Sequence, residues 1–255
     1  MKIKVIGCSG AEFPGHNTPA FLLNEEILFD AGSFTNVLDE KAQFKIKNIF
    51  ITHAHLDHLR GIPFLADNII VGNMNHRVNI YSISSVLKTI KKHLFNSSVW
   101  PDFTIIPHPE GGILNLIALK PGKSLHLDDF SITPYEVTHN VPAVGYFVEG
   151  KKKRSFFYTG DTKPSSSTWK EIGDRQIHCL IIDVSFPNNM KDMATRAGHL
   201  TPDLLKNELM KIRCEPEEIC ITHVKPQYLK TISSELKGLK IKNLRLLRDG
   251  DTIKI

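Results

Sequence analysis

The chain has 255 residues, of which 41% are hydrophobic and 23% are charged, and these values suit one globular domain or at most two small ones. A chain of this length buries about 70–75% of its unfolded surface, so it needs neither a disulfide nor a structural metal to hold a core. The net charge of +5 fits an anionic substrate without identifying a nucleic-acid-binding protein. The twelve histidines are more informative, because histidine is the commonest metal ligand and the usual acid or base near neutral pH.

The apolar runs and the cysteines exclude two classes of protein. No apolar run approaches the ~18 residues of a membrane-spanning helix, and residues 1–7 alternate like a strand and lack a signal-peptide core. We therefore expect no membrane contact. The cysteines form no Cys-x-x-Cys pair, which argues against a thiolate metal site. They indicate reduced, buried thiols in a cytoplasmic protein. They are Cys8, Cys179, Cys214 and Cys220.

The N-terminal half is expected to be rich in strands, because short apolar or alternating runs are separated by turn residues. The expected strands lie at 2–7, 20–24, 27–30, 46–52, 113–119, 124–127, 130–138, 145–148 and 155–159. Residues 84–95 interrupt this series with apolar side chains at helical spacing, which predicts a helix.

The second half alternates strands with helices. Thr201-Pro202-Asp203 is typical of a helix start, with threonine as N-cap, proline at the first helical position and an acid in the first turn. Strands are expected at 179–183, 218–222, 244–247 and 252–255, and a second helix at about 226–237. No repeat or long linker divides the chain, so we expect a single domain over 1–255 with a layered α/β architecture.

Six apolar runs end abruptly in a residue able to bind a metal ion. Strands that end together at one edge of a layered sheet deliver their terminal side chains to a common cleft, and ligands bind at the carboxyl edge of open α/β sheets. Chance explains six such endings poorly, so we expect one shared site. The residues are Asp30, His53, His139, Asp161, Asp183 and His223.

The segment His53-Ala54-His55-Leu56-Asp57-His58 concentrates three imidazoles and a carboxylate in six residues. Each of these groups needs a partner if it is buried, so the segment is poor packing material. A polar surface loop is the weaker explanation, since dense His/Asp clusters are rarely structural. A turn can point His53 and His55 one way and Asp57 and His58 another, which would serve two metal ions ~3.5–4 Å apart that share a hydroxide.

His53-x-His55-x-Asp57-His58 resembles the H-x-H-x-D-H signature of the metallo-β-lactamase superfamily, and the other strand-end residues match its further motifs in order. The resemblance covers nearly the whole chain and implies a four-layer αββα sandwich with a dinuclear, usually zinc, site at one edge of two sheets. The first metal would be held by His53, His55 and His139, the second by Asp57, His58 and His223, with Asp161 bridging them and Asp30 orienting ligands. Manganese and iron stay open beside zinc, because all these ligands are nitrogen or oxygen donors.

Three segments resemble the class II cyclic-nucleotide phosphodiesterases. The histidine motif continues into Leu59-x-Gly61-Ile62 as in that family, and 222–226 resemble its last motif, H-x-K-P. Residues 183–186, followed by Gly198-His199-Leu200-Thr201, resemble segments shared by these phosphodiesterases and by ribonuclease Z.

His199 lies two residues before the expected N-cap, where a helix N-terminus favours anions. We expect it to bind a phosphoryl oxygen or to protonate the leaving oxygen, with Asp183 orienting it, while Asp57 shuttles a proton. The alternative is a solvated loop histidine, and whether Asp57 or His199 is the leaving-group acid stays open. Lys163 and Lys225 can also pair with phosphate, although such lysines are more often solvated, and His16 is the only other histidine placed to reach a substrate.

These features predict a metal-dependent phosphodiester hydrolase in which a hydroxide shared by two metals attacks phosphorus. The resemblance favours a small anionic substrate, a 3′,5′-cyclic nucleotide. The main alternative is a ribonuclease Z-like tRNA 3′-processing endonuclease with nucleic acid as its partner, but the long basic arm usual in that family has no room in the short stretch between His139 and Asp161. Another hydrolase of the superfamily is the weaker alternative, because the β-lactamase and thioester-hydrolase branches lack the His199 segment. Base specificity, the native metal and the oligomeric state, including a homodimer, stay open.

Overall fold

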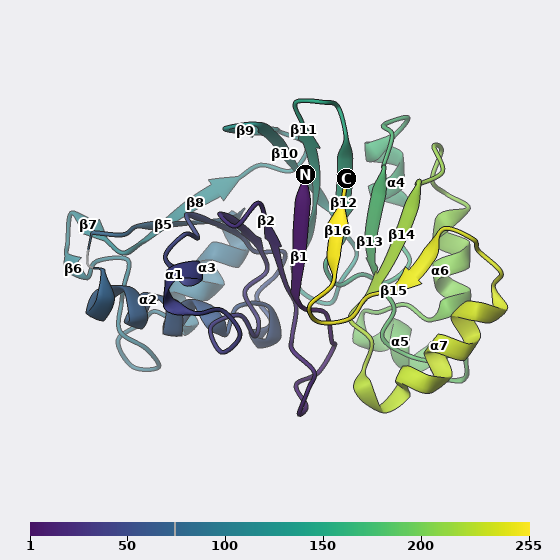
Figure 1. Cartoon of the computed structure of the whole chain (residues 1–255), viewed down its shortest axis with the longest axis horizontal. Helices are drawn as coiled ribbons and strands as arrows, with labels where there is room; N and C mark the ends of the chain where they lie inside the picture. The colour runs from purple at the N-terminus through teal and green to yellow at the C-terminus, as the bar shows by residue number, and fades with distance from the viewer. Residues whose placement is uncertain (74) are drawn as a thin grey trace.

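Two seven-stranded sheets stack face to face at the centre of the molecule (Figure 1). The computed structural model describes residues 1–73 and 75–255. In sheet order, the first sheet consists of β16 (Thr252–Lys254), β1 (Lys2–Gly7), β2 (Ala20–Leu23), β3 (Ile27–Phe29), β4 (Asn48–Phe50), β5 (Val78–Ile83) and β8 (Leu114–Leu119). The second consists of β15 (Leu244–Leu246), β14 (Glu218–Thr222), β13 (Cys179–Asp183), β12 (Ser155–Tyr158), β11 (Val144–Gly150), β10 (Phe130–Glu136) and β9 (Leu125–Leu127). A separate hairpin pairs β6 (Pro107–His108) with β7 (Gly111–Gly112).

Helices cover the outer face of each sheet, which gives four layers in the order helix, sheet, sheet, helix (Figure 1). The first sheet carries α1 (Glu40–Gln43), α2 (Gly61–Gly72) and α3 (Ser84–His93). On the side of the second sheet lie α4 (Ser166–Ile172), α5 (Lys191–Ala197), α6 (Pro202–Leu209) and α7 (Leu229–Gly238). Three single 3-10 turns complete the described elements: η1 (Leu56–His58), η2 (Asn188–Met190) and η3 (Pro226–Tyr228). The predicted αββα sandwich is therefore confirmed.

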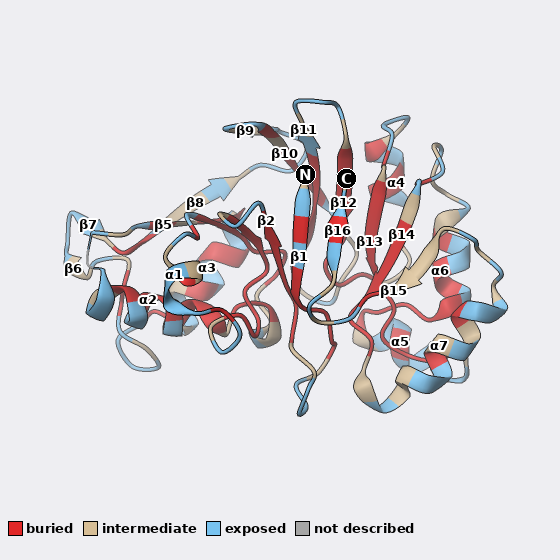
Figure 2. Cartoon of the chain, viewed as in Figure 1, coloured by how far each residue is buried: buried red, intermediate tan, exposed pale blue. Residues whose placement is uncertain are grey.

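The apolar residues form three cores, one between the sheets and one under each helical layer. Figure 2 shows the buried strands at the centre and the exposed residues on the outer helices and the loops. Aromatic rings dominate the core between the sheets: Phe50 stacks on Phe29 and on Tyr81, with centroid distances of 5.4 and 4.7 Å. Phe156 of the second sheet meets Phe29 edge-on at 5.4 Å, so these rings join the two sheets directly.

Each sheet combines antiparallel strands with a parallel half, and the parallel halves determine where the loops meet. In the first sheet β3, β4, β5 and β8 are parallel, and in the second β12, β13, β14 and β15 are parallel. Such strands are buried on both faces and read as continuous apolar runs, as Cys179–Asp183 does. Their carboxyl ends share one edge, as the sequence predicted.

The predicted elements agree with the structure within a few residues, with two kinds of difference. The expected helix at 226–237 begins as the 3-10 turn η3 and becomes α-helical only at Leu229. The expected strand 46–52 is shorter, since only Asn48–Phe50 pairs with its neighbours. No element was predicted at α1, α2, β5, β6, β7, α4 or α5. Thr201 caps α6 as predicted, and its Oγ1 accepts a hydrogen bond from Leu204 N.

The cysteines are free, and three of the four are buried, as the sequence predicted. Cys179 and Cys220 lie on adjacent strands with their sulfur atoms 3.8 Å apart. Over the described residues, the structure has no helix that combines the length and the apolar character needed to cross a membrane.

Replacing Phe29 by alanine is expected to lower the free energy of unfolding by about 3–5 kcal/mol, because a cavity would open between the sheets. Urea unfolding measures this change. Val71→Ala, at a side chain of α2 that is 84% exposed, is the control and should alter the free energy by less than about 0.5 kcal/mol. Similar losses for the two variants would contradict a tightly packed core between the sheets.

Candidate metal centre

Loops from both sheets bring seven histidines and aspartates together at the carboxyl edge, in two groups joined by Asp161. The first group consists of His53, His55, His139 and Asp161, and one ligand atom from each lies within 4.8 Å of all the others. His53 Nε2 is 3.0 Å from His55 Nδ1, and His139 Nε2 is 3.3 Å from the same atom. Nitrogen atoms with lone pairs face one another at these distances only if a proton or a cation lies between them.

The second group consists of Asp57, His58 and His223, whose ligand atoms also lie within 4.8 Å of one another. His223 Nε2 is 3.4 Å from His58 Nε2 and 3.4 Å from Asp57 Oδ2. The turn η1 separates the side chains of the histidine motif as expected, with His53 and His55 in the first group and Asp57 and His58 in the second.

Asp161 lies between the groups. Its Oδ2 is 3.6 Å from His53 Nε2, while its Oδ1 is 3.3 Å from both His58 Nε2 and His223 Nε2. Oδ1 is buried and lies near these two nitrogens, but no described residue donates it a hydrogen bond of good geometry. A buried carboxylate oxygen in this state is costly, and a cation would satisfy it. The donor set of imidazole nitrogens and carboxylate oxygens therefore fits divalent metal binding.

Most of these histidines are held through one ring nitrogen by a neighbouring protein group, which turns the other nitrogen toward the centre. His53 Nδ1 is 3.0 Å from Thr52 Oγ1, and His139 Nδ1 is 2.9 Å from the carbonyl oxygen of Gly198. His223 Nδ1 is 2.8 Å from Ser185 Oγ. No local pattern assigns these partners a role, although Thr52 and Ser185 each lie within two residues of a predicted site residue.

Asp30 contacts His58 in the same way and lies outside both groups. Its Oδ2 is 2.7 Å from His58 Nδ1 and accepts a hydrogen bond from the hydroxyl of Tyr158 at 2.6 Å. Its Oδ1 accepts from the backbone N–H and the hydroxyl of Thr52. The Asp30 carboxylate is completely buried and fully satisfied.

Two of the eight described residues other than glycine that have positive φ lie at the centre. Asp30 and His223 have positive φ values of 53° and 64°, which are uncommon for residues other than glycine and cost of order 1–3 kcal/mol each. Gly160 has φ 59°, and a Cβ there would lie 2.7 Å from that of Thr52, so the turn before Asp161 requires glycine. Such strain persists where the surrounding structure enforces a functional geometry.

Burial and mutual charge set the protonation of the centre. Burial lowers the pKa values of His53, His55 and His139. Burial alone would raise the pKa values of Asp57 and Asp161, but the adjacent imidazoles outweigh it and lower both. Neutral imidazoles and ionised carboxylates are the forms that bind metal ions.

The pKa of His58 is shifted in the opposite direction from those of His53, His55 and His139. Burial alone would lower its pKa, but Asp161, Asp30 and Asp57 outweigh burial and raise the pKa well above the ordinary value. A metal ion at the second group would therefore displace a proton from His58.

His199 and Asp183 lie against the centre. His199 Nδ1 is 3.0 Å from Asp183 Oδ2, and the His199 ring stacks on that of His223 with centroids 5.1 Å apart. One nitrogen of His199 also lies within 4.8 Å of ligand atoms of Asp161 and His223. Burial would lower the pKa of His199, but Asp183 outweighs burial and raises it. His199 is thus a buried histidine beside the centre rather than a solvated loop residue.

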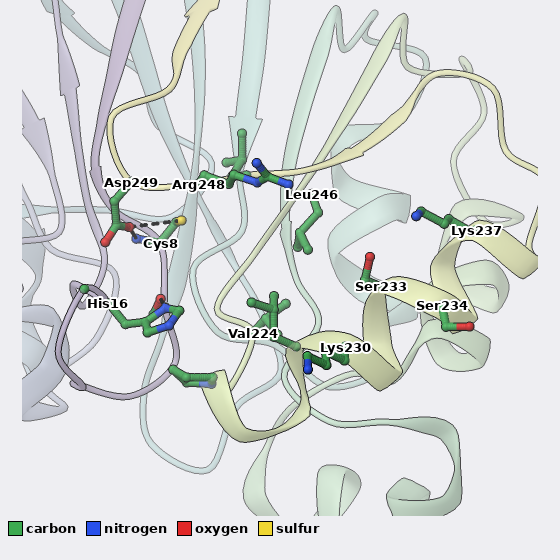
Figure 3. Close-up of a pocket in the computed structure, with 15 residues that line it drawn as sticks. Cys8, His16, Val224, Lys230, Ser233, Ser234, Lys237, Leu246, Arg248 and Asp249 are labelled. Carbon is green, nitrogen blue, oxygen red and sulfur yellow. Dashed lines mark hydrogen bonds between the residues drawn. The ribbon is translucent and has the colours of Figure 1, made fainter.

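The remaining candidates lie farther out. Lys225 Nζ donates to the carbonyl oxygen of Gly10 at 3.0 Å, and Lys163 Nζ is 3.4 Å from Asn140 Oδ1. His16 lines a hollow of about 590 Å³ between the β1–β2 loop, β15 and α7. Figure 3 shows His16 there with Cys8, Asp249 and Lys230. We call this cavity the basic hollow, because Lys230, Lys237 and Arg248 border it.

Comparison with known proteins identifies the family. The family model described as the beta-lactamase superfamily domain matches residues 26–224. The chain therefore belongs to this superfamily, as the sequence predicted.

Several curated or solved proteins are similar to the chain. The "Probable 3′,5′-cyclic-nucleotide phosphodiesterase" of Yersinia pestis is 28% identical over 72% of this chain, which spans only 58% of that relative's length. Ribonuclease Z of Archaeoglobus fulgidus is 24% identical, over 94% of this chain and 92% of its own length. The crystal structure of unliganded yeast PDE1 matches with a TM-score of 0.85 over 100% of this chain and 99% of its own, at 19% identity. At that identity the structural likeness shows the fold.

Replacing Asp183 by asparagine is expected to lower the pKa of His199, because the charge that outweighs burial would be removed. NMR titration of the imidazole nitrogens in the metal-free protein measures the shift. Asp192→Asn on the exposed face of α5 is the matched control and should leave that pKa unchanged. An unaltered pKa in Asp183→Asn would contradict the assigned partnership.

Proposed function

We propose that this protein is a 3′,5′-cyclic-nucleotide phosphodiesterase that binds two divalent metal ions, with zinc as the expected ion. The observation that carries the proposal is the position of Asp161, whose two carboxylate oxygens face different groups of histidines. A carboxylate in this position can bridge two cations, and two-metal sites are typical of phosphodiester hydrolysis.

The ligands are assigned from the two groups. The first ion would be held by His53, His55 and His139, the second by Asp57, His58 and His223, with Asp161 shared. Their distances and their mostly neutral or anionic forms support this assignment. When bound, the two cations supply Lewis-acid stabilisation of phosphoryl charge and a water molecule of lowered pKa as nucleophile.

We assign His199 the role of contacting the phosphoryl oxygen or protonating the leaving oxygen. Its Nδ1 is engaged by Asp183, so its Nε2 is the nitrogen available to a phosphoryl or leaving oxygen. In the metal-free protein, Asp183 outweighs burial and raises the pKa of the His199 ring. Asp183 holds the ring orientation and stabilises the charged imidazole, while Ser185 Oγ donates to the other oxygen of Asp183 at 2.6 Å.

Asp57 is assigned a proton-transfer role in addition to metal binding. Its side chain is 32% exposed, against 3% for Asp161, so of these two carboxylates Asp57 is the one that solvent can reach. The neighbouring imidazoles keep it ionised. Its carboxylate can therefore accept a proton from the attacking water and pass it to solvent.

The second candidate function is tRNA 3′ processing, which the Archaeoglobus ribonuclease Z relative supports by its coverage. The short segment between β10 and α4 disfavours it. That segment holds only the β11–β12 hairpin, and two charges of its basic tip are paired: Lys151 with Asp129 and Arg154 with Glu217. A solvated, partly neutralised turn offers little charge to an RNA backbone.

The zinc-reconstituted protein is expected to hydrolyse 3′,5′-cyclic AMP to the 5′-monophosphate and to hydrolyse bis(p-nitrophenyl) phosphate. A precursor tRNA is expected to remain intact under the same conditions. Chromatography of the nucleotides and gel electrophoresis of the RNA measure these reactions. Cleavage of the precursor tRNA without hydrolysis of cyclic AMP would overturn the choice in favour of ribonuclease Z activity.

Replacing Asp161 by alanine is expected to weaken binding of both metal ions by more than about 100-fold, since even partners outside the ligand set contribute 10–100-fold. Hydrolysis of cyclic AMP should be lost together with the metal. Calorimetric titration of zinc and elemental analysis of the purified protein measure binding. The control Asp192→Ala should retain both ions and full activity, whereas two tightly bound ions in Asp161→Ala would contradict the bridging role.

A further inference from the structure

We infer that a hollow beside the metal centre binds the nucleobase attached to the scissile phosphodiester, an inference that rests on the proposed function. The hollow has a volume of about 610 Å³, within the range of small-molecule sites. Phe64 and Trp100 line it, and we call it the aromatic hollow. Asp57 belongs both to its wall and to the second group of the centre, so a ligand in the hollow lies next to the centre.

Two aromatic side chains from separate segments line the hollow, beside the ion pair of Arg60 and Glu12. Phe64 of α2 and Trp100 of the loop after α3 meet edge to face, with centroids 5.4 Å apart and planes at 68°. Edge-to-face packing covers one face of one ring and leaves other ring faces available for a planar heterocycle. Phe64 remains 46% exposed. A base stacked on it would bury part of this apolar surface, and such burial is favourable.

Trp100 also carries an unsatisfied donor. Its Nε1 is buried and has no hydrogen-bond partner among the described residues, a condition shared there only by Asp161 Oδ1 in the centre. An indole nitrogen can only donate, and nucleobases present nitrogen and oxygen acceptors. Of these two atoms, Asp161 Oδ1 lies in the metal centre, and Trp100 Nε1 belongs to a residue that lines the aromatic hollow.

The loop that carries Trp100 is held in place before any ligand binds. Asn96 Oδ1 accepts hydrogen bonds from the backbone N–H groups of Ser98 and Val99 at 3.0 and 2.8 Å. Farther along, Asp102 pairs with Lys91 and accepts a hydrogen bond from Thr104 Oγ1 at 2.6 Å. A wall ordered in advance reduces the entropy lost on binding.

The basic hollow is the competing site for an anionic nucleotide, but it lacks the features of a base site. Its described lining contains no phenylalanine, tyrosine or tryptophan. A bridge between Ser9 and Val224 and the hydrogen bond from His223 N to Cys8 O place the β1–β2 loop between it and the centre. Cations border it (Figure 3), so its chemistry suits a phosphate group better than a nucleobase.

Tryptophan fluorescence tests the inference without catalysis. Of the two tryptophans in the chain, Trp169 is 4% exposed and donates to Glu208, so it supplies a constant background. Adenosine titrated into the metal-free protein should quench the emission saturably. Trp100→Phe should remove that change while the Trp169 signal reports an intact fold. Phe64→Ala should weaken adenosine binding about 5- to 150-fold, the range that base stacking contributes.

The control variant is Lys230→Ala in the basic hollow, which should bind adenosine like the unmodified protein. Cyclic AMP and a short oligoribonucleotide are then compared as competitors, and the one that displaces adenosine at the lower concentration identifies the source of the base. Absence of saturable quenching, quenching that survives in Trp100→Phe, weaker adenosine binding in Lys230→Ala or displacement by neither competitor would overturn the inference. Adenosine contains no phosphodiester, so a protein that binds it but fails to hydrolyse cyclic AMP would refute only the proposed function.

Discussion

The buried Asp30 carboxylate connects the architecture of this protein to its metal centre. It follows β3, accepts hydrogen bonds from Thr52 at the end of β4 and from Tyr158 of the opposite sheet, and lies 2.7 Å from the His58 ring. One side chain thereby joins both sheets and the histidine motif. A fully buried carboxylate is tolerated only when its acceptor sites are satisfied, so these contacts require one another. The orientation of His58 consequently depends on how the two sheets are placed against each other.

The parallel halves of the sheets supply the second constraint. Parallel strands share a carboxyl edge, so residues distant in sequence reach one place without long loops. His223 follows β14 directly and Asp161 comes three residues after β12. At this edge, Asp30 and His223 adopt positive φ values of 53° and 64°. Short connections after parallel strands can therefore hold several histidine and aspartate side chains close together in the metal-free protein.

The pattern of strands and helices predicted a layered α/β architecture, and the resemblance of the histidine motif to the metallo-β-lactamase superfamily added the four-layer αββα sandwich. Helix α2 was missed although Ile62, Leu65, Ala66 and Ile69 are buried at helical spacing, because Gly61 and Pro63 at its start obscure the pattern; proline is tolerated in a first turn.

Strand β5 was missed because polar residues interrupt its apolar run. Its Asn79 and Ser82 find partners only in the folded sheet, Asn79 with Asn48 and Ser82 with the Ile51 carbonyl. The pairing of Phe64 with Trp100, and the pairing of Asp30 with Tyr158, join segments that no local pattern relates. Such contacts depend on how layers pack, which a single sequence does not reveal.

The β1–β2 loop is a partition shared by two cavities. Ser9 and His16 line the basic hollow, whereas Ala11, Glu12 and Thr18 line the aromatic hollow. The Asp249 carboxylate holds the two ends of the loop, because it accepts hydrogen bonds from the backbone N–H groups of Cys8 and Asn17. One short loop thus lines both cavities, and its tip is held as well, since Glu12 pairs with Arg60 and Phe13 exchanges backbone hydrogen bonds with His16.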